Sequence, residues 1–463
     1  MERNKIYYCS SEGFCGDFIP FYHDGIYHLY HISGRGWKHV TTKDFVNFED
    51  LGMSIDGSDD ENAYDKSIFT GCIMEHEGVF HMFYCGYNDK LSPCQVVLHA
   101  TSRDLHNWEK DPSLLIKPDG EQYTLFAFRD PYVFYNEEAG EFWMLVTTAI
   151  TEMRSKRWGT VALYASKDLK NWEKRDPIYS PYSFDSHECP DMFKMGDKWY
   201  LVFSEYTRWW ETKYRISDSP NGPWEIPAND MFDGRTFYAA KTVSNGKRRF
   251  IVGWVCHKTN GDDKTKYMWG GNLLVHEIKQ NDDGTLSAVP IKEVLDAFTE
   301  PRNIAASDSF GGEWKIEGDR FLGKAEGFST IKLGSAGSDT LYKAKIKIAP
   351  NTFSAGIVFR AEYPFFDKWC MLKIEQKKGR IYFDSFYKFF DDVFFDEIRP
   401  IKVTVDNVYD LKIITSGNIF SVYLNDDVAL SGRCYSYLSG DFGLFVENGT
   451  AEFFDLSVLE STI

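Results

Sequence analysis

Three stretches of this chain read almost alike: His39–Glu49 is HVTTKDFVNFE, His99–Glu109 is HATSRDLHNWE and Leu163–Glu173 is LYASKDLKNWE. A fainter fourth copy, Ile216–Glu225, reads ISDSPNGPWE. The copies lie 50 to 64 residues apart. Self-similarity at such a spacing indicates one supersecondary unit that is repeated along the chain.

Each unit also carries a turn glycine followed by an aromatic-rich run that is typical of a strand. The five turn glycines are Gly25, Gly78, Gly140, Gly196 and Gly246. Glycine supplies the positive φ that a tight hairpin needs, and an apolar run also precedes each turn. Five cycles of strand, hairpin and strand favour an all-β fold that begins with a five-bladed β-propeller. A β-sandwich or β-helix with chance similarity is the alternative.

The chain is long enough for two domains, and its pattern changes near residue 290. We expect the propeller over 1–290, a linker with a short helix over 291–306, and a C-terminal antiparallel β-sandwich over 307–463. In the last part, alternation such as Tyr342, Ala344, Ile346 and Ile348 on one strand face indicates half-buried strands. The aromatic run at 389–395 is expected to pack on the propeller or to form a dimer contact.

Composition excludes several classes of partner. The net charge is −17, and no basic stretch is present that would neutralise nucleic-acid phosphates or anionic lipid. No secretory signal or membrane span is visible, and the nine dispersed cysteines read as reduced thiols, so we expect a cytoplasmic monomer or homodimer. No cofactor fingerprint is present, and no metal is expected because the spacing of His23, His28, His31 and His39 suits no standard zinc set.

Counting back from the turn glycines places Asp17, Asp130 and Glu188 at equivalent points of three first strands, alongside Thr70 and Tyr238. The first strands of propeller blades line the central channel, so these side chains should converge at one end of it. Three acids in one ring would shift each other's pKa, and hydrolysis of a glycosidic bond uses such a set of carboxylates. The alternative for each acid is a strand-end role in capping backbone amides.

Several short motifs resemble those of glycoside hydrolase family 32, which contains invertases, inulinases, levanases and fructosyltransferases. They are Arg129-Asp130-Pro131, Glu188-Cys189-Pro190-Asp191, Trp37-Lys38-His39, Phe69-Thr70-Gly71 and Phe237–Thr242. The resemblance implies a retaining hydrolase of terminal β-fructofuranosides in small fructose-containing saccharides. Asp17 would be the nucleophile, Glu188 the acid/base with a raised pKa, and Asp130 the stabiliser of the transition state. The substrate-binding residues would be Arg129, Trp37, His39, Phe69, Thr70, Cys189 and Tyr238.

The motif around the nucleophile departs from that family pattern. An Asn is expected before the Asp and a Gln at the end of the next strand, whereas this chain has Gly16 and Ile32. Both amides hold the terminal fructose in ordinary members. The departure keeps three alternatives open: a fructosyltransferase, a furanosidase related to arabinan-active propellers, and a sugar-binding propeller without catalysis.

Overall fold

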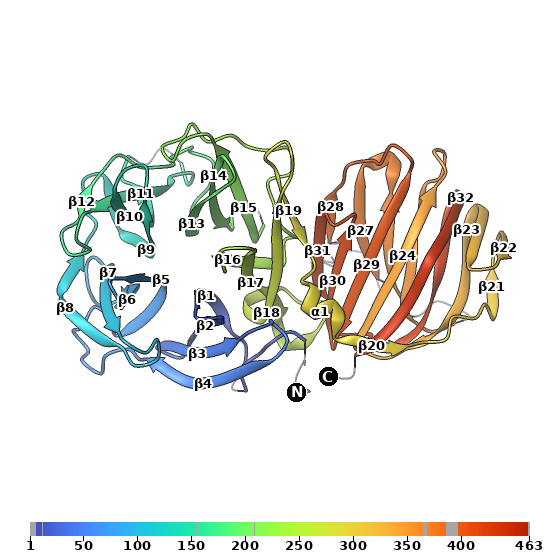
Figure 1. Cartoon of the computed structure of the whole chain (residues 1–463), viewed down its shortest axis with the longest axis horizontal. Coiled ribbons are helices and arrows are strands. Elements are labelled where there is room, and N and C mark those ends of the chain that lie inside the picture. Colours follow the sequence, from blue (N-terminus) through green and yellow to red (C-terminus); the bar gives the residue numbers. More distant parts are fainter. Residues whose placement is uncertain are drawn as a thin grey trace.

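The computed structural model of the protein describes residues 6–11, 13–152, 155–207, 209–363, 368–385 and 397–461. It consists of two β-rich bodies that lie side by side, a ring of small sheets and a layered body of long strands (Figure 1). A short helix, α1 (Lys292–Asp296), lies where the two bodies meet. The predicted five-bladed propeller followed by a sandwich is confirmed.

Each blade is an antiparallel sheet whose strands follow in chain order from the channel outward. The blades are β1 (Gly16–His23), β2 (Ile26–Ser33), β3 (Gly36–Thr42) and β4 (Phe48–Ile55); β5 (Ser67–His76), β6 (Val79–Tyr87), β7 (Gln95–Ser102) and β8 (Glu109–Ile116); β9 (Tyr123–Asn136), β10 (Glu141–Ile150), β11 (Gly159–Ser166) and β12 (Glu173–Lys174); β13 (Glu188–Met195), β14 (Lys198–Glu205) and β15 (Glu211–Ser217); β16 (Phe237–Ser244), β17 (Arg249–Lys258), β18 (Tyr267–Gln280) and β19 (Leu286–Val289).

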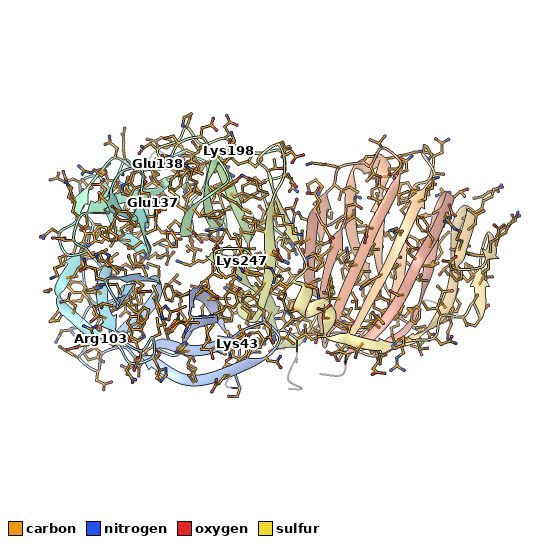
Figure 2. All side chains as sticks on the ribbon, in the orientation of Figure 1. Lys43, Arg103, Glu137, Glu138, Lys198 and Lys247 are labelled. Carbon is orange, nitrogen blue, oxygen red and sulfur yellow. The ribbon has the colours of Figure 1, made fainter. Side chains whose placement is uncertain are left out.

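The repeated string is a turn that satisfies its own backbone between the third and fourth strands. In the first copy, the Thr42 hydroxyl accepts the amide of Phe45, and the Asp44 carboxylate accepts those of Val46 and Asn47. Ser102 with Asp104, and Asp168 of the third copy, make the same kind of bonds. Figure 2 shows two of these turns on neighbouring blades, with Lys43 and Arg103 labelled. The sequence repeat therefore encodes local turn chemistry.

The faint fourth copy belongs to the blade with three full strands. There the outer position is reduced to two isolated bridges, Lys213 with Met231 and Ile216 with Glu225. Weaker turn chemistry thus coincides with a weaker outer edge.

The N-terminal segment closes the ring against the fifth blade. Cys15 pairs with Gly271 of β18 through two backbone hydrogen bonds, and the Leu273 amide donates to the Tyr8 carbonyl oxygen. The Tyr7 hydroxyl then donates to Ser421 of the sandwich at 3.0 Å. The N-terminal segment therefore contacts both the fifth blade and the sandwich.

The second body is one antiparallel sheet folded on itself around its own core. Its strands are β20 (Phe298–Pro301), β21 (Asp308–Phe310), β22 (Glu313–Glu317), β23 (Arg320–Ala336), β24 (Thr340–Ile348), β25 (Ser354–Ala361), β26 (Cys370–Glu375), β27 (Arg380–Ser385), β28 (Ile398–Pro400), β29 (Val408–Ser416), β30 (Ile419–Leu424), β31 (Val428–Arg433) and β32 (Gly440–Ser461). The face of β24 expected to be apolar is buried. Strand β20 falls inside the expected linker and pairs with β32, and the run at 389–395 lies outside the described residues.

A buried polar network joins the two bodies. The Asp233 carboxylate accepts the Ser431 amide at 2.6 Å and lies 2.8 Å from Nε2 of His276, whose Nδ1 is 2.9 Å from the Tyr423 hydroxyl. The side chains of Asp233 and His276 are fully buried. Burial acts to raise the pKa of Asp233, but the hydrogen bonds from His276 and its neighbours hold it below its ordinary value.

Removing this carboxylate should lower the stability of the folded protein. We expect Asp233→Ala to lower the free energy of unfolding by roughly 3–5 kcal/mol, because it leaves buried donors without an acceptor. Urea unfolding followed by circular dichroism measures the change. Asp218→Ala is the control, since that carboxylate is 84% exposed in its ion pair with Lys198 and should cost less than about 1 kcal/mol. Equal loss in the two variants would contradict the prediction.

Candidate active site

The innermost strand of every blade is interrupted by a β-bulge, in which two residues oppose one on the next strand. The bulged pairs are Asp17–Phe18, Phe69–Thr70, Asp130–Pro131, Cys189–Pro190 and Ala239–Ala240. The first residue of the pair has a positive φ in four blades, at 50° for Asp17 and 55° for Asp130. Such backbone is costly for a non-glycine residue and re-aims its side chain, and it is found most often at functional sites. The bulges mark the end of the channel where the inner strands begin, here called the mouth.

Asp17 lies at the mouth between donors from two other blades. The Thr70 hydroxyl donates to its Oδ2 at 2.7 Å, and Nε1 of Trp254 donates to its Oδ1 at 3.3 Å. Its neighbours Cys15 and Phe18 are buried. Asp17 is therefore a half-buried carboxyl whose described hydrogen-bond partners are neutral.

Glu188 is held by a cation and a phenol. Nη2 of Arg129 donates to its Oε1 at 2.7 Å and also to the Ser186 hydroxyl at 3.0 Å. The Tyr238 hydroxyl donates to Oε2 at 2.5 Å. The predicted substrate-site residues Arg129 and Tyr238 thus orient the carboxyl expected to act as acid and base.

Asp130 is 4% exposed and is fixed by donors from its own blade and from the next one. The backbone amide of Cys189 donates to its Oδ2 at 3.0 Å, and the Thr147 hydroxyl donates to the same oxygen at 3.2 Å. Burial raises the pKa of the Cys189 thiol well above its ordinary value, so this thiol stays protonated and is no nucleophile. Cys189 contributes its amide to the site.

The three acids share one electrostatic environment. The pKa of Asp17 is raised to about 7, chiefly by burial and also by the charges of Asp130 and Glu188, against the hydrogen bond from Thr70. The sequence did not predict the raised pKa of Asp17, which arises because this carboxyl is buried beside neutral hydrogen-bond donors. The raised pKa expected at Glu188 stays a prediction.

The acids do not occupy one register position, as the count from the turn glycines had suggested. Asp17 and Asp130 are the first residues of their bulges, Glu188 and Tyr238 come one residue earlier, and Thr70 comes one residue later. The bulges twist the strands enough for these side chains to meet all the same. The same twist allows the Arg129 guanidinium to reach Glu188.

Three predicted substrate residues have described contacts with residues other than the carboxylates. Trp37 is fully buried and donates to the carbonyl oxygen of Phe69, whose ring stacks on Tyr87 with centroids 4.6 Å apart. His39 is 1% exposed and lies 3.0 Å from a ring nitrogen of His28. In the described part of the chain no hydrogen bond links Trp37, Phe69 or His39 to the acids. Trp37 and Phe69 brace the first two blades against each other, and a substrate contact by any of these residues stays a prediction.

The structure adds an aromatic wall that sequence reasoning missed. Trp210, Tyr238, Trp254 and Trp269 contact one another beside Asp17 and Glu188, with ring centroids 5.2 to 6.1 Å apart. Trp254 opposes Tyr238 directly in the register of β16 and β17. Pairing the two strands of this hairpin in the sequence would have placed Trp254 beside Tyr238 and so indicated part of the aromatic wall. Aromatic walls with a few convergent polar groups are typical of small-molecule sites.

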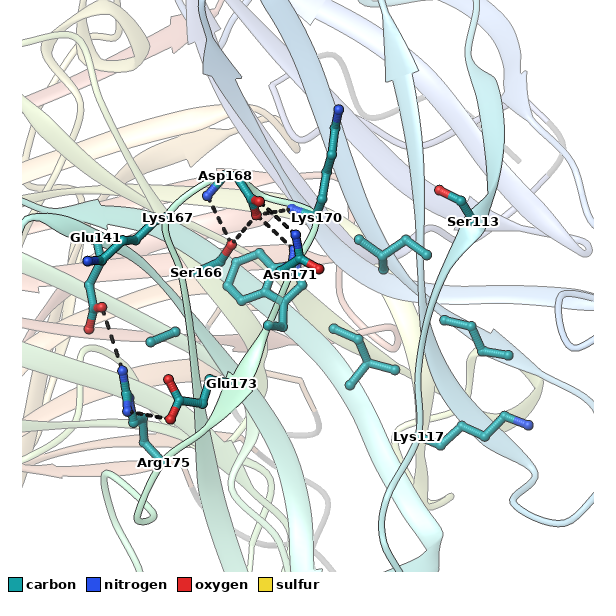
Figure 3. Close-up of a pocket in the computed structure, with 15 residues that line it drawn as sticks. Ser113, Lys117, Glu141, Ser166, Lys167, Asp168, Lys170, Asn171, Glu173 and Arg175 are labelled. Carbon is teal, nitrogen blue, oxygen red and sulfur yellow. Dashed lines mark hydrogen bonds and ion pairs between the residues drawn. The ribbon is translucent and has the colours of Figure 1, made fainter.

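A separate groove lies between β8 and the third copy of the repeated turn (Figure 3). Its volume is about 620 Å³, and Leu114, Trp172 and several charged side chains line it. Arg175 is paired there with Glu141 and Glu173, and Asp168 bonds within its own turn. Its lining contains none of the mouth residues, so it is separate from the acidic site.

Among the described residues, no group of three or more His, Cys, Asp or Glu side chains is arranged to hold a metal ion. Over the same residues, every helix falls short of the length and apolar character that a bilayer crossing requires.

Comparison with known proteins points to one family. The model of the glycosyl hydrolases family 32 N-terminal domain matches residues 16–290. The sucrose-6-phosphate hydrolase of Vibrio alginolyticus is 25% identical over 303 residues, which are 59% of this chain and 60% of that protein. The raffinose invertase of Escherichia coli is 26% identical over 282 residues, 56% of each chain. The chain thus spans less than two thirds of the length of these relatives.

Solved structures show the same fold over the whole chain. The β-fructofuranosidase of Aspergillus kawachii superposes with a TM-score of 0.77 at 16% identity, covering 100% of this chain and 94% of that one. The exo-inulinase of Aspergillus awamori gives 0.75 at 17% identity, covering 99% and 98%.

The fold and the site together define a propeller–sandwich protein with an acidic centre at the mouth of its channel. Since the family model matches more than half of the sequence, the chain belongs to glycosyl hydrolase family 32.

Proposed function

We propose that the protein is a retaining β-fructofuranosidase that releases terminal fructose from small saccharides. The observation that carries the proposal is the meeting of Asp17, Asp130 and Glu188 in one electrostatic environment, each held by described hydrogen bonds. A retaining glycosidase needs a nucleophilic carboxylate and an acid/base carboxyl about 5–5.5 Å apart.

In the first step, the Asp17 carboxylate attacks the anomeric carbon of the fructosyl unit. Glu188 gives its proton to the oxygen of the leaving group, and the glycosidic bond breaks to leave a fructosyl ester on Asp17. Arg129 and Tyr238 fix the Glu188 carboxyl, and the carboxylate left after proton transfer is stabilised by the guanidinium 2.7 Å away.

In the second step, Glu188 removes a proton from water, which attacks the anomeric carbon and releases Asp17. Two inversions give net retention. Asp130 supports both steps by holding sugar hydroxyls as positive charge develops on the ring. Both of its described donors engage Oδ2, which leaves Oδ1 for this task among the residues described.

The altered nucleophile motif favours a second candidate, a furanosidase for a sugar other than fructose. Gly16 has no side chain, and Ile32, which pairs with it across β1 and β2, is buried. Neither can donate the amide hydrogen bonds that the resemblance would place here.

A substrate panel tests the proposal. Because the relatives are named for sucrose 6-phosphate, raffinose and fructans, the panel should contain sucrose, sucrose 6-phosphate, raffinose, kestose, inulin and levan, with aryl arabinofuranosides beside them. Fructose release with retention of anomeric configuration is expected. Cleavage of arabinofuranosides alone would favour the second candidate, formation of longer saccharides from sucrose would indicate transfer, and binding without turnover would contradict both hydrolase proposals.

The raised pKa of Asp17 predicts an acid limb in the pH profile. Asp17 must be ionised to attack, so kcat/KM should fall as the pH drops below about 7. Thr70→Val removes a donor that favours the ionised form, so the limb should move to higher pH. At pH 6 we expect a further loss of roughly tenfold relative to the wild type. Thr70→Ser should keep the original profile, and an unmoved limb in the Val variant would contradict this assignment.

A further inference from the structure

Trp269 stands directly over Gly16, the residue before the nucleophile. A β-carbon added to Gly16 would lie 2.3 Å from the Cζ2 atom of Trp269 and within 2.7 Å of two more atoms of the ring. Real side chains do not approach so closely, and the obstacle is a rigid ring. The indole therefore fills the space that any side chain at position 16 would need.

The backbone of β18 is built to hold the ring there. Cys256 of β17 pairs with Gly271 and His257 pairs with Met268, so Trp269 and Gly270 bulge out of the ladder. Gly270 has a φ of 85°, and its carbonyl oxygen lies 2.9 Å from Nδ1 of His257. This local irregularity points Trp269 out of its own sheet and across to the start of β1.

The ring of Trp269 is both anchored and accessible. Its centroid lies 6.1 Å from that of Trp254, which donates to Asp17, and the residue is 45% exposed. The start of β1 is tied to β18 through the Cys15–Gly271 bridge, so ring and nucleophile are held together. The Trp269 ring thus forms an apolar surface at the mouth beside Asp17. Position 16, a glycine, adds no hydrogen-bonding side chain to it.

We propose that Trp269 is a specificity-determining residue that replaces hydrogen bonding at position 16 by stacking. The corner formed by Gly16 and Trp269 receives the C–H face of a furanoside ring, and it tolerates sugars that lack the hydroxyl directed there. This inference rests on the proposed function, because it concerns the sugar unit attacked by Asp17. A site that hydrogen-bonds a hydroxyl rejects the deoxy analogue by a large factor, whereas an apolar wall does not.

Kinetics with methyl β-D-fructofuranoside and its monodeoxy analogues test the proposal. The wild type should cleave at least one analogue within about threefold of the parent sugar. Trp269→Ala should raise KM roughly tenfold with a smaller effect on kcat, and Trp269→Phe should recover part of the loss. Tyr135→Ala, which removes an equally exposed ring near the hairpin at the far end of β9, is the control and should change neither constant.

A double-mutant comparison gives the sharpest outcome. Gly16→Asn alone should lower kcat/KM roughly 100-fold, because the indole and the start of β1 must shift. Gly16→Asn combined with Trp269→Ala should recover at least tenfold of that loss and should now discriminate against the tolerated deoxy analogue. Thermal unfolding checks that each variant is folded. Equal activity of Gly16→Asn and the wild type, or no recovery in the folded double variant, would overturn the proposal.

Failure of the proposed function is distinguishable from failure of this inference. If the wild type cleaves no fructoside, equilibrium binding of fructose and arabinose, followed by tryptophan fluorescence, replaces the kinetics. Binding weakened at least fivefold in Trp269→Ala supports stacking on this apolar surface without any turnover. Unchanged affinity in that folded variant rejects it.

Discussion

Asp17→Asn should reduce kcat on the best saccharide by about 10⁴–10⁶-fold while the fold is retained. The amide cannot form the covalent ester, yet it is nearly isosteric and still accepts hydrogen bonds from Thr70 or Trp254. It also removes an acid whose pKa is raised by burial and by two neighbouring carboxylates, so the variant should be no less stable than the wild type at neutral pH. Initial-rate assays and thermal unfolding measure the two effects.

Asp24→Asn is the matched control for that variant. Asp24 is in the turn that follows β1, its side chain is 89% exposed, and its φ of 47° suits asparagine equally well. Its activity should be that of the wild type. Residual activity of Asp17→Asn above about 1% would exclude Asp17 as the nucleophile.

Glu188→Gln should show a loss that depends on the leaving group. On sucrose, whose leaving oxygen needs a proton, kcat/KM should fall roughly 10²–10⁴-fold. On an aryl β-fructofuranoside with a good leaving group the loss in the first step should be far smaller, and the second step should become limiting. Stopped-flow release of the aryl alcohol would then show a burst.

Glu137→Gln, in the exposed hairpin of the third blade (Figure 2), controls for the loss of a carboxylate. It should leave both substrates unaffected. Equal losses of Glu188→Gln on sucrose and on the aryl substrate would mean that Glu188 positions substrate through Arg129 and is no proton donor.

The number of blades could be predicted because its signals are local. A turn glycine sets each hairpin, and the Asp and Asn of the repeated string bond within their own turn. These interactions need no knowledge of distant residues. Five copies of a local signal therefore predicted a global architecture.

The fine position of the acids could not be predicted in the same way. The distance from bulge to hairpin differs between blades: five residues, 19–23, follow the bulge in the first blade and six, 71–76, in the second, although both hairpins have two residues. Counting from the turn therefore misses the bulge by one residue in some blades. The acids converge because the ring closes, so an error of one residue does not affect that prediction. The same error does change the predicted position of each acid along its strand.

The aromatic wall and the burial of His39 escaped prediction for a related reason. Trp254 and Trp269 reach the mouth from β17 and β18, far along the chain from Asp17. The position of Trp269 also depends on a register shift near His257 that no short sequence motif indicates. His39 lies near Trp37 in a recognisable motif, but a motif does not state how deep in a blade a side chain lies.

The contacts of Tyr7 with Ser421 and of Asp233 with Ser431 have a thermodynamic consequence. These hydrogen bonds join the N-terminal segment and the start of the fifth blade to strands of the other body. Unfolding of either body would therefore break them. The two bodies should therefore unfold in one cooperative transition. A fragment that ends after β19 would lack these contacts, and its ring of blades would be less stable.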